Sequence, residues 1–216
     1  VVVSTDDPRA RDIARAMGCV VVDRPPHLAT DTATVDDAVR HAVDAVSSSG
    51  RDDPYAHPAR PVVVLYANVP VRPAGLIDRA VELLVSTGCD SVQSYATVGK
   101  HHPWWTVRID AEHDGGEASG VVRPWEGETL YHGVYRRQDL PGAFVPDGGV
   151  MAVAVRSLFC RVSGVAPGPH AFLGRDRRAV MTREGEVVDI DSRVDMVVAD
   201  VLLRERRAEP SRGMTA

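Results

Sequence analysis

Hydrophobic and polar positions alternate along this chain in blocks that predict strands and helices in turn. Short apolar runs predict strands at residues 1–3, 20–22 and 62–66, and alternating polar and apolar residues predict a strand at 91–95. Between them, apolar residues recur every three or four positions over residues 8–17, 35–46 and 74–87, which is the period of amphipathic helices. This alternation predicts an α/β fold, a Rossmann-like three-layer sandwich with a mainly parallel sheet. The most continuous run, residues 62–66, is expected to be a central parallel strand buried on both faces.

The pattern changes at residue 101 and returns near residue 148. Residues 101–146 show no long helical period, and short strands and loops are expected near residues 104–109, 121–125 and 136–138. A strand at 148–155, a Gly/Pro loop at 162–172, a short strand at 180–182 and a helix at 194–206 follow. We expect a single domain over residues 1–207 and a flexible tail over 208–216.

Composition narrows the class of partner. The chain has 216 residues, 44% of them hydrophobic, and a net charge of −5. It therefore lacks the basic surface expected for nucleic-acid binding, and no apolar run reaches the roughly 18 residues of a membrane span. We expect a small-molecule partner. The chain also starts without Met on the apolar run 1–3, so we expect an N-terminal segment to be missing.

Three widely spaced cysteines, Cys19, Cys89 and Cys160, have apolar or small neighbours. Their odd number and spacing favour core thiols in a reducing compartment over a metal or redox site. The chain is therefore expected to be cytoplasmic.

The strongest candidate for chemistry is the segment 188–191, which contains Asp189 and Asp191. The period of a strand places both carboxylates on one face, where like charges require a proton, a cation or a metal between them. Mg²⁺ is the best candidate metal, because it prefers oxygen ligands and often binds one or two carboxylates together with substrate phosphates. The alternative is a solvated strand end at which Asp191 caps the helix that starts near Ser192.

Other candidate residues follow predicted strands. In open α/β sheets, ligands bind at the carboxyl ends of the strands, so Asp6, Asp7, Arg24, Asn68 and the two aspartates are expected to share one rim. The alternative for each is a cap or turn residue.

Several arginines are placed to bind an anion. Arg24 before two prolines and Arg72 between Pro70 and Pro73 have rigid flanks that suit a positioned guanidinium. One residue of the pair Arg136 and Arg137 could face an anionic substrate, and a plain basic loop is the alternative. In the motif H-H-P-W-W, packing of the tryptophans is favoured over a metal site, because adjacent histidines in a strand point to opposite faces.

Seven short motifs together resemble one family, the acylneuraminate cytidylyltransferases. They are V-S-T-D-D (3–7), R-P-P-H-L-A-T-D-T-A-T (24–34), P-V-R-P (70–73), H-H-P-W-W (101–105), R-R-Q-D-L-P (136–141), D-G-G (147–149) and D-I-D-S-R-V-D (189–195). The resemblance implies a dimeric nucleotidyltransferase that transfers CMP from CTP to a sialic-acid-like (nonulosonic) sugar acid. Such an enzyme releases pyrophosphate and uses Mg²⁺.

The resemblance also implies roles for individual residues. Asp189 and Asp191 match the family's metal aspartates, and Arg137 matches an arginine near the sugar carboxylate. Arg24, Asp31 and Thr34 match a nucleotide-binding segment, and the stretch at about 115–145 resembles a dimerisation arm. Further substrate-binding residues are expected at Tyr66, Asn68, Arg72 and Met151.

Departures from the family pattern concentrate on the sugar side. Tyr66 stands where the sialic-acid enzymes have a sugar-contacting glutamine, Asp147 where Asn is usual, and Met151 where a tyrosine is common. We therefore expect a different nonulosonic acid, such as a pseudaminic- or legionaminic-type sugar. The Q-G-D-E-P motif of the related Kdo-activating enzymes is missing. The family's Gly-rich phosphate loop is also missing, so a chain that truly starts at Val1 is expected to be inactive, and the rival function is a catalytically silent binding or partner subunit.

Overall fold

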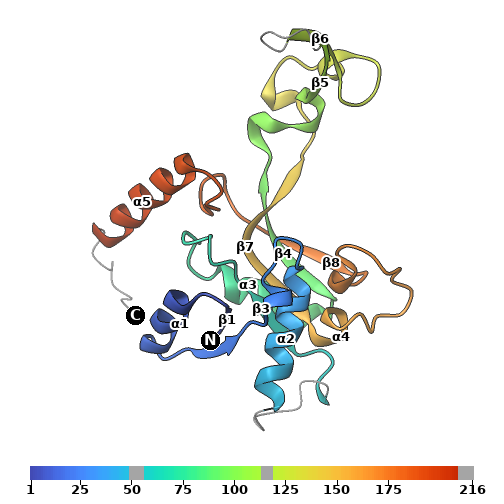
Figure 1. Ribbon diagram of the computed structural model, residues 1–216. Coiled ribbons are helices and arrows are strands. Elements are labelled where there is room, and N and C mark those ends of the chain that lie inside the picture. The colour runs from blue at the N-terminus through green and yellow to red at the C-terminus, as the bar shows by residue number, and fades with distance from the viewer. Residues whose placement is uncertain (49–55, 113–118, 209–216) are drawn as a thin grey trace, which may run out of the picture. The chain divides into compact units, whose positions relative to one another are not determined.

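The computed structural model describes residues 1–48, 56–112 and 119–208 (Figure 1). Its contacts form two compact units. Unit 1 consists of Val1–Ala67, Ala74–Gln93 and Val150–Val180, and unit 2 of Asn68–Pro73, Ser94–Gly149 and Met181–Ala216. The single domain expected over residues 1–207 stays a prediction. Part of the expected arm and nearly all of the tail lie outside the described residues.

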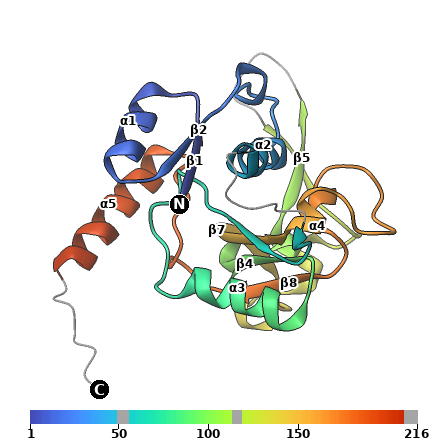
Figure 2. The same ribbon diagram turned by 90° about the horizontal axis from the view of Figure 1, so that it is seen from below.

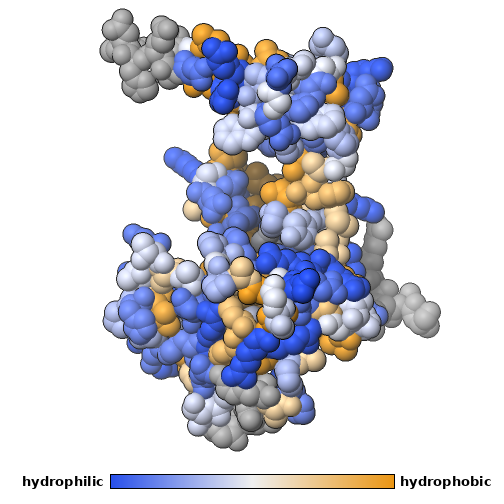
Figure 3. Space-filling view, turned by 90° about the vertical axis from the view of Figure 1, so that its right-hand side faces the viewer, coloured by the Kyte–Doolittle hydropathy of each residue, from blue (hydrophilic) through white to orange (hydrophobic). Residues whose placement is uncertain are grey.

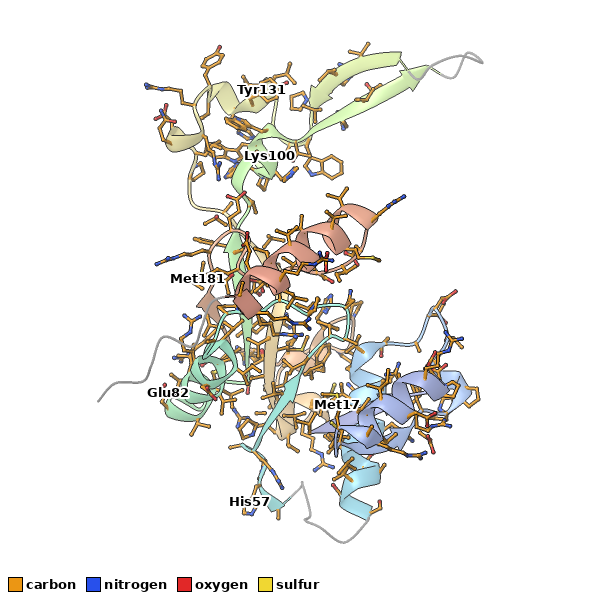
Figure 4. The ribbon with its side chains drawn as sticks, turned by 90° about the vertical axis from the view of Figure 1, so that its left-hand side faces the viewer. Met17, His57, Glu82, Lys100, Tyr131 and Met181 are labelled. Carbon is orange, nitrogen blue, oxygen red and sulfur yellow. The ribbon has the colours of Figure 1, made fainter. Side chains whose placement is uncertain are left out.

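Unit 1 begins with a parallel strand pair joined by a helix. Strands β1 (Val2–Thr5) and β2 (Val20–Asp23) pair in parallel across α1 (Pro8–Ala16). The Asp7 carboxylate caps α1 by accepting hydrogen bonds from two main-chain N–H groups, and Pro8 occupies the first turn, as the sequence predicted. On the predicted apolar face of α1, Ala14 is buried, but Ile13 and Met17 (labelled in Figure 4) are exposed. The helical period identifies a shared face but not what covers it.

A four-stranded sheet has the order β3-β7-β4-β8. Strand β3 pairs antiparallel with β7 and is only partly buried, so the expectation of a central parallel strand is wrong for it. An aliphatic run indicates a strand with apolar side chains, but it does not indicate where the strand lies in the sheet or in which direction it runs. The α/β fold class itself is confirmed. The strands are β3 (Pro61–Val64), β7 (Phe144–Ala154), β4 (Ser91–Thr97) and β8 (Arg177–Met181).

Helices α2 (Val35–Ser48) and α3 (Leu76–Thr87) lie on opposite sides of the sheet (Figure 2). Val39 and Val43 of α2 pack against a buried cluster that includes Met151 and Val153. Gly75, at φ 72°, precedes α3, and Gly88, at φ 65°, ends it, a conformation that a residue with a Cβ rarely adopts. Shorter helical turns are η1 (Pro26–Leu28), α4 (Val155–Leu158) and η7 (Ala171–Leu173).

Unit 2 contains a hairpin and the C-terminal helix. Strands β5 (Val107–Glu112) and β6 (Ser119–Pro124) pair antiparallel, and α5 spans Arg193–Ala208. Val71 and Val188 form a β-bridge and pack with Ala199 of α5. Of the short strands and loops expected near residues 104–109, 121–125 and 136–138, β5 and β6 are the strands, and residues 104–106 and 136–138 lie in 3₁₀ turns or loops. The turns are η3 (Gly99–His101), η4 (Pro103–Trp105), η5 (Leu130–Gly133) and η6 (Arg137–Asp139).

Within the described residues, no helix is long and apolar enough to cross a membrane. Of the three cysteines, Cys89 is buried, Cys19 is half-buried and Cys160 is exposed. The expectation of three core thiols is therefore wrong for Cys160, which lies directly after α4 in a left-handed conformation at φ 52°.

Candidate functional site

The segment with the two aspartates runs beside residues 68–71 in unit 2. The Val188 N–H donates to the Val71 carbonyl at 3.2 Å, and the Ile190 N–H donates to the Asn68 carbonyl at 2.9 Å. The Asn68 side-chain amide also donates to Asp189 Oδ1 at 2.5 Å. These bonds fix the main chain on both sides of Asp189 and one oxygen of its carboxylate.

A capping box fixes the other end of the segment. The Asp195 carboxylate accepts hydrogen bonds from the Ser192 N–H at 2.7 Å and the Asp191 N–H at 3.2 Å, while the Asp195 N–H donates to Ser192 Oγ at 3.3 Å. Ser192 and Asp195 therefore cap α5. Asp191 contributes its main-chain N–H to this box, so the alternative in which the Asp191 side chain caps the helix is not what the structure shows.

The charges around Asp189 favour a cation. Burial raises the pKa of the Asp189 carboxyl, the negative charges of Asp191 and Asp195 raise it further, and Asn68 and Arg72 partly oppose this rise. Half-buried Asp189 and exposed Asp191 thus offer carboxylate oxygens at a place where positive charge is stabilising. Among the described residues, no group of three or more His, Cys, Asp or Glu side chains could hold a metal ion. The two carboxylates fit Mg²⁺ only as a partial ligand set that substrate oxygens complete.

Arg72 is a positioned guanidinium in the same unit. Its Nε donates to the Gly149 carbonyl at 2.6 Å, Nη1 donates to the Val69 carbonyl, and its own carbonyl accepts a hydrogen bond from Arg206 at 2.7 Å. Burial lowers the pKa of Arg72, and the charge of Asp189 works against that lowering. The guanidinium of Arg72 is therefore held in place by carbonyl groups, and its role in substrate binding stays a prediction.

Arg137 lies on the exposed turn η6 of unit 2. Its Nη2 donates to Glu184 Oε2 at 3.0 Å, whereas its neighbour Arg136 pairs with Asp139 on the same turn. One arginine of the pair thus already faces a carboxylate from a distant part of the sequence. Sequence reasoning missed Glu184, because nothing in its surroundings marks it as a partner 47 positions away.

The remaining predicted residues belong to unit 1. Arg24 donates to the Ser4 carbonyl at 2.6 Å and to Ser4 Oγ at 3.3 Å, so its guanidinium is held against β1. Thr34 Oγ1 accepts a hydrogen bond from the Asp37 N–H at 3.3 Å and caps α2. Asp31 is exposed before this cap.

Of the residues predicted on the sugar side, Met151 lies in the core of unit 1 and Tyr66 is partly buried against that core. Met151 is 5% exposed and belongs to the cluster of Val153, Leu158, Phe172 and Leu173, against which Tyr66 also packs. The structure therefore gives both side chains a packing role. Their assignment to substrate binding stays a prediction.

Sequence comparison identifies relatives with one shared name. No family model matches the chain. Three proteins named N-acylneuraminate cytidylyltransferase, from Streptococcus agalactiae serotypes V, III and Ia, are each 28% identical to it over 197 residues. The match covers 91% of this chain and 41% of each relative.

The chain is similar to N-acylneuraminate cytidylyltransferases. The resemblance that the seven motifs indicated is thereby confirmed. The chain spans about two fifths of the length of these curated relatives, so the activity of the whole protein is a matter for proposal.

Solved structures agree on the fold. CMP:2-keto-3-deoxy-manno-octonic acid synthetase complexed with CTP superposes with a TM-score of 0.55 at 14% identity, covering 94% of this chain and 81% of that one. 4-Diphosphocytidyl-2C-methyl-D-erythritol synthase gives a TM-score of 0.51 at 15% identity, covering 94% and 80%. At these identities the likeness shows only that the chain shares the fold of these two proteins, which confirms the predicted Rossmann-like α/β fold class.

Asp147, one of the expected departures from the resembled family, accepts a hydrogen bond on each of its two carboxylate oxygens. Its carboxylate accepts hydrogen bonds from the Ser94 and Thr182 hydroxyls and, at 2.9 Å, from the Gly149 N–H. Ser94 and Thr182 are buried. This departure from the family pattern therefore acts within unit 2, where it fixes Gly149, whose carbonyl holds Arg72.

Proposed function

We propose that this protein transfers CMP from CTP to a nonulosonic, sialic-acid-like sugar acid and releases pyrophosphate, in a reaction that depends on Mg²⁺. The observation that carries the proposal is the pair Asp189 and Asp191, held in one segment of unit 2 by Asn68 and the capping box. The shared name of the curated relatives supports the choice of CMP transfer.

Each site residue has a role in this proposal. Asp189 and Asp191 would hold Mg²⁺, which when bound neutralises charge on the phosphates and favours departure of pyrophosphate. Arg72, next to Asp189, adds positive charge at the same place. Arg137 binds the carboxylate of the sugar acid through its guanidinium, which suits a carboxylate geometrically. Arg24, Asp31 and Thr34 of unit 1 contact the nucleotide. Substrate contacts were also expected at Tyr66 and Met151 of unit 1 and at Asn68 of unit 2.

The proposed chemical step is an in-line displacement at phosphorus. A hydroxyl oxygen of the sugar acid forms a bond to the α-phosphorus of CTP, and the bond from that phosphorus to the bridging oxygen of the β-phosphate breaks. Pyrophosphate leaves with the bonding electron pair, and the hydroxyl proton passes to water. Such transfers depend mainly on positioning and charge neutralisation, which carboxylates, a metal and fixed arginines provide.

A homodimer is part of the proposal. The arm in unit 2 exposes large apolar side chains, and hydrophobic residues lie among hydrophilic ones at the top of the surface in Figure 3, where the arm is. Solvent-exposed apolar groups in such number are typical of an interface with another chain. Among the described residues from 107 to 145, the large apolar side chains at least 40% exposed are Ile109, Val121, Val122, Trp125, Leu130, Tyr131 (labelled in Figure 4), Tyr135, Phe144 and Val145.

The test of the function is pyrophosphate release by the full-length protein with Mg²⁺. Each of the four nucleoside triphosphates is combined with a panel of nonulosonic acids. Release with CTP alone and with one acid would establish the transferase and its substrate together. No release with any pair, from folded full-length protein, would contradict the proposal and favour a silent binding subunit.

The dimer is tested separately by sedimentation of the wild type and of a double variant, Ile109→Glu with Val121→Glu. Both side chains are more than half exposed, so the substitutions are expected to leave the fold intact. A dimeric wild type and a monomeric variant are the expected result. A monomeric wild type would contradict the proposed arm contact.

A further inference from the structure

We propose that Asn68 is a positioning residue that orients Asp189 for metal binding, and that it does not act by contacting the substrate. This inference rests on the proposed function and deepens it, because Asn68 was expected among the substrate-binding residues. Its side-chain amide donates to Asp189 Oδ1 at 2.5 Å, and its main-chain carbonyl accepts the Ile190 N–H at 2.9 Å. One residue thus holds both the carboxylate and the backbone beside it.

The base from which Asn68 acts is rigid. Val69 and Val71 are 1% and 0% exposed, and Pro70 between them restricts the backbone. The Val71 carbonyl accepts the Val188 N–H in an isolated antiparallel bridge, so residues 68–71 are tied to residues 188–190 by two main-chain hydrogen bonds. The exposed side chain of Asn68 therefore projects from the end of an anchored segment.

The chemistry of an amide suits this position. Asp189 lies among the negative charges of Asp191 and Asp195, so a neighbour must donate a hydrogen bond without adding another negative charge. An asparagine amide meets both conditions, whereas an aspartate at position 68 would have no proton to donate at neutral pH. Hydrogen bonds that orient a metal-binding carboxylate typically change metal affinity by about 10- to 100-fold.

The opposite side of the segment is fixed independently. The Asp195 carboxylate accepts the Asp191 N–H, which sets the main chain of the second metal-binding residue. In the proposed site, the second oxygen of Asp189 and the Asp191 carboxylate would supply the metal ligands. Asn68 thus completes a site in which the ligand geometry exists before the ion binds.

The sequence offers a direct spectroscopic test, because Asn68 is the only asparagine among its 216 residues. In protein labelled with ¹⁵N at asparagine, the side-chain amide signal that disappears in Asn68→Ser belongs to Asn68. Asp189→Asn is expected to shift this signal, and Mn²⁺ is expected to broaden it through proximity. An amide signal that neither treatment changes would overturn the inference.

Metal affinity provides the second measurement. Mn²⁺ binding, followed by the electron paramagnetic resonance of the free ion, is compared among the wild type, Asn68→Ala and Asn68→Asp. Both variants are expected to bind Mn²⁺ about 10-fold or more weakly. The matched control, Gln138→Ala, removes an exposed amide elsewhere in unit 2 and is expected to leave the affinity unchanged.

The outcomes separate this inference from the proposed function. Unchanged Mn²⁺ affinity in Asn68→Ala, together with a raised KM for the sugar acid, would overturn the positioning role while leaving the transferase in place. Stronger Mn²⁺ binding by Asn68→Asp would also overturn it, because residue 68 would then be a direct ligand. A wild type that releases no pyrophosphate but shows the expected Mn²⁺ and amide results would contradict the function and leave the positioning role standing.

Discussion

The Arg137 guanidinium lies 3.0 Å from the Glu184 carboxylate, a contact between two exposed side chains of unit 2. The arginine that is proposed to bind the sugar acid is therefore already paired with a carboxylate of the protein itself. Exposed ion pairs contribute about 0–1 kcal/mol, so an incoming carboxylate can displace Glu184 at small cost.

Replacing Arg137 with Ala is expected to raise the KM for the sugar acid about 10-fold or more and to change the KM for CTP much less. The physical reason is the loss of a two-point contact with the acid's carboxylate. Steady-state kinetics with each substrate varied in turn makes the measurement. Arg136→Ala, which removes the neighbouring arginine that pairs with Asp139, is the matched control. Equal effects of Arg137→Ala on both KM values would count against the assignment.

Replacing Asp191 with Asn is expected to abolish Mg²⁺-dependent pyrophosphate release and to leave the melting temperature nearly unchanged. The side chain is exposed and the capping box uses only its main-chain N–H, so the fold does not depend on its charge. Turnover and thermal unfolding are measured on the same preparation. Asp200→Asn, which removes a carboxylate of α5 that pairs with Arg204, controls for the change in net charge. Retained turnover in Asp191→Asn would refute the metal role.

Asp90 is expected to make the stability of unit 1 depend on acidic pH. Burial alone would raise the pKa of its carboxyl, but the Arg175 and Asp176 N–H groups and the Arg156 guanidinium together hold the pKa below its ordinary value. A carboxyl with a lowered pKa in the folded state stabilises the fold above its ordinary pKa, near pH 4, and loses that contribution as the pH falls further.

Asp90→Asn is accordingly expected to lower the free energy of unfolding at pH 7 by about 1–3 kcal/mol, and by less near pH 3. Urea unfolding at several pH values measures the difference. Asp176→Asn is a suitable comparison, since that carboxylate is exposed and pairs with Arg178 at the surface. A loss of stability that is the same at both pH values would contradict the lowered pKa.

Met151→Ala is expected to destabilise the protein by about 2–5 kcal/mol, because it opens a cavity in a cluster where the side chain is 5% exposed. Met151→Leu keeps the volume and is expected to cost less than about 1.5 kcal/mol. Unfolding and the KM for the sugar acid are measured for both. A large change in KM for Met151→Leu with unchanged stability would favour substrate contact over packing.

The sequence by itself determined where most helices begin and end and which residues are candidates for the site. Local rules account for the caps of α1 and α2, because a capping side chain bonds to N–H groups two or three residues away. They also account for the bounds of α3 to within two residues and for the paired aspartates, because the periods of helices and strands depend only on neighbours in the chain. The seven motifs could likewise be found in the sequence alone, because each is a short run of neighbouring residues, and their order indicated the resemblance to the acylneuraminate cytidylyltransferases.

Tertiary structure alone decided which partners these residues have. Strand β3 lies beside β7 and antiparallel to it, although its apolar run would fit a central parallel strand equally well. Asn68 meets Asp189 across 121 positions, and Arg137 meets Glu184 across 47. Contacts over such separations depend on how packing brings segments together, and no local pattern of polarity records that. The sequence thus identified Asp189 as a candidate metal ligand, and the tertiary structure brought Asn68 to its carboxylate.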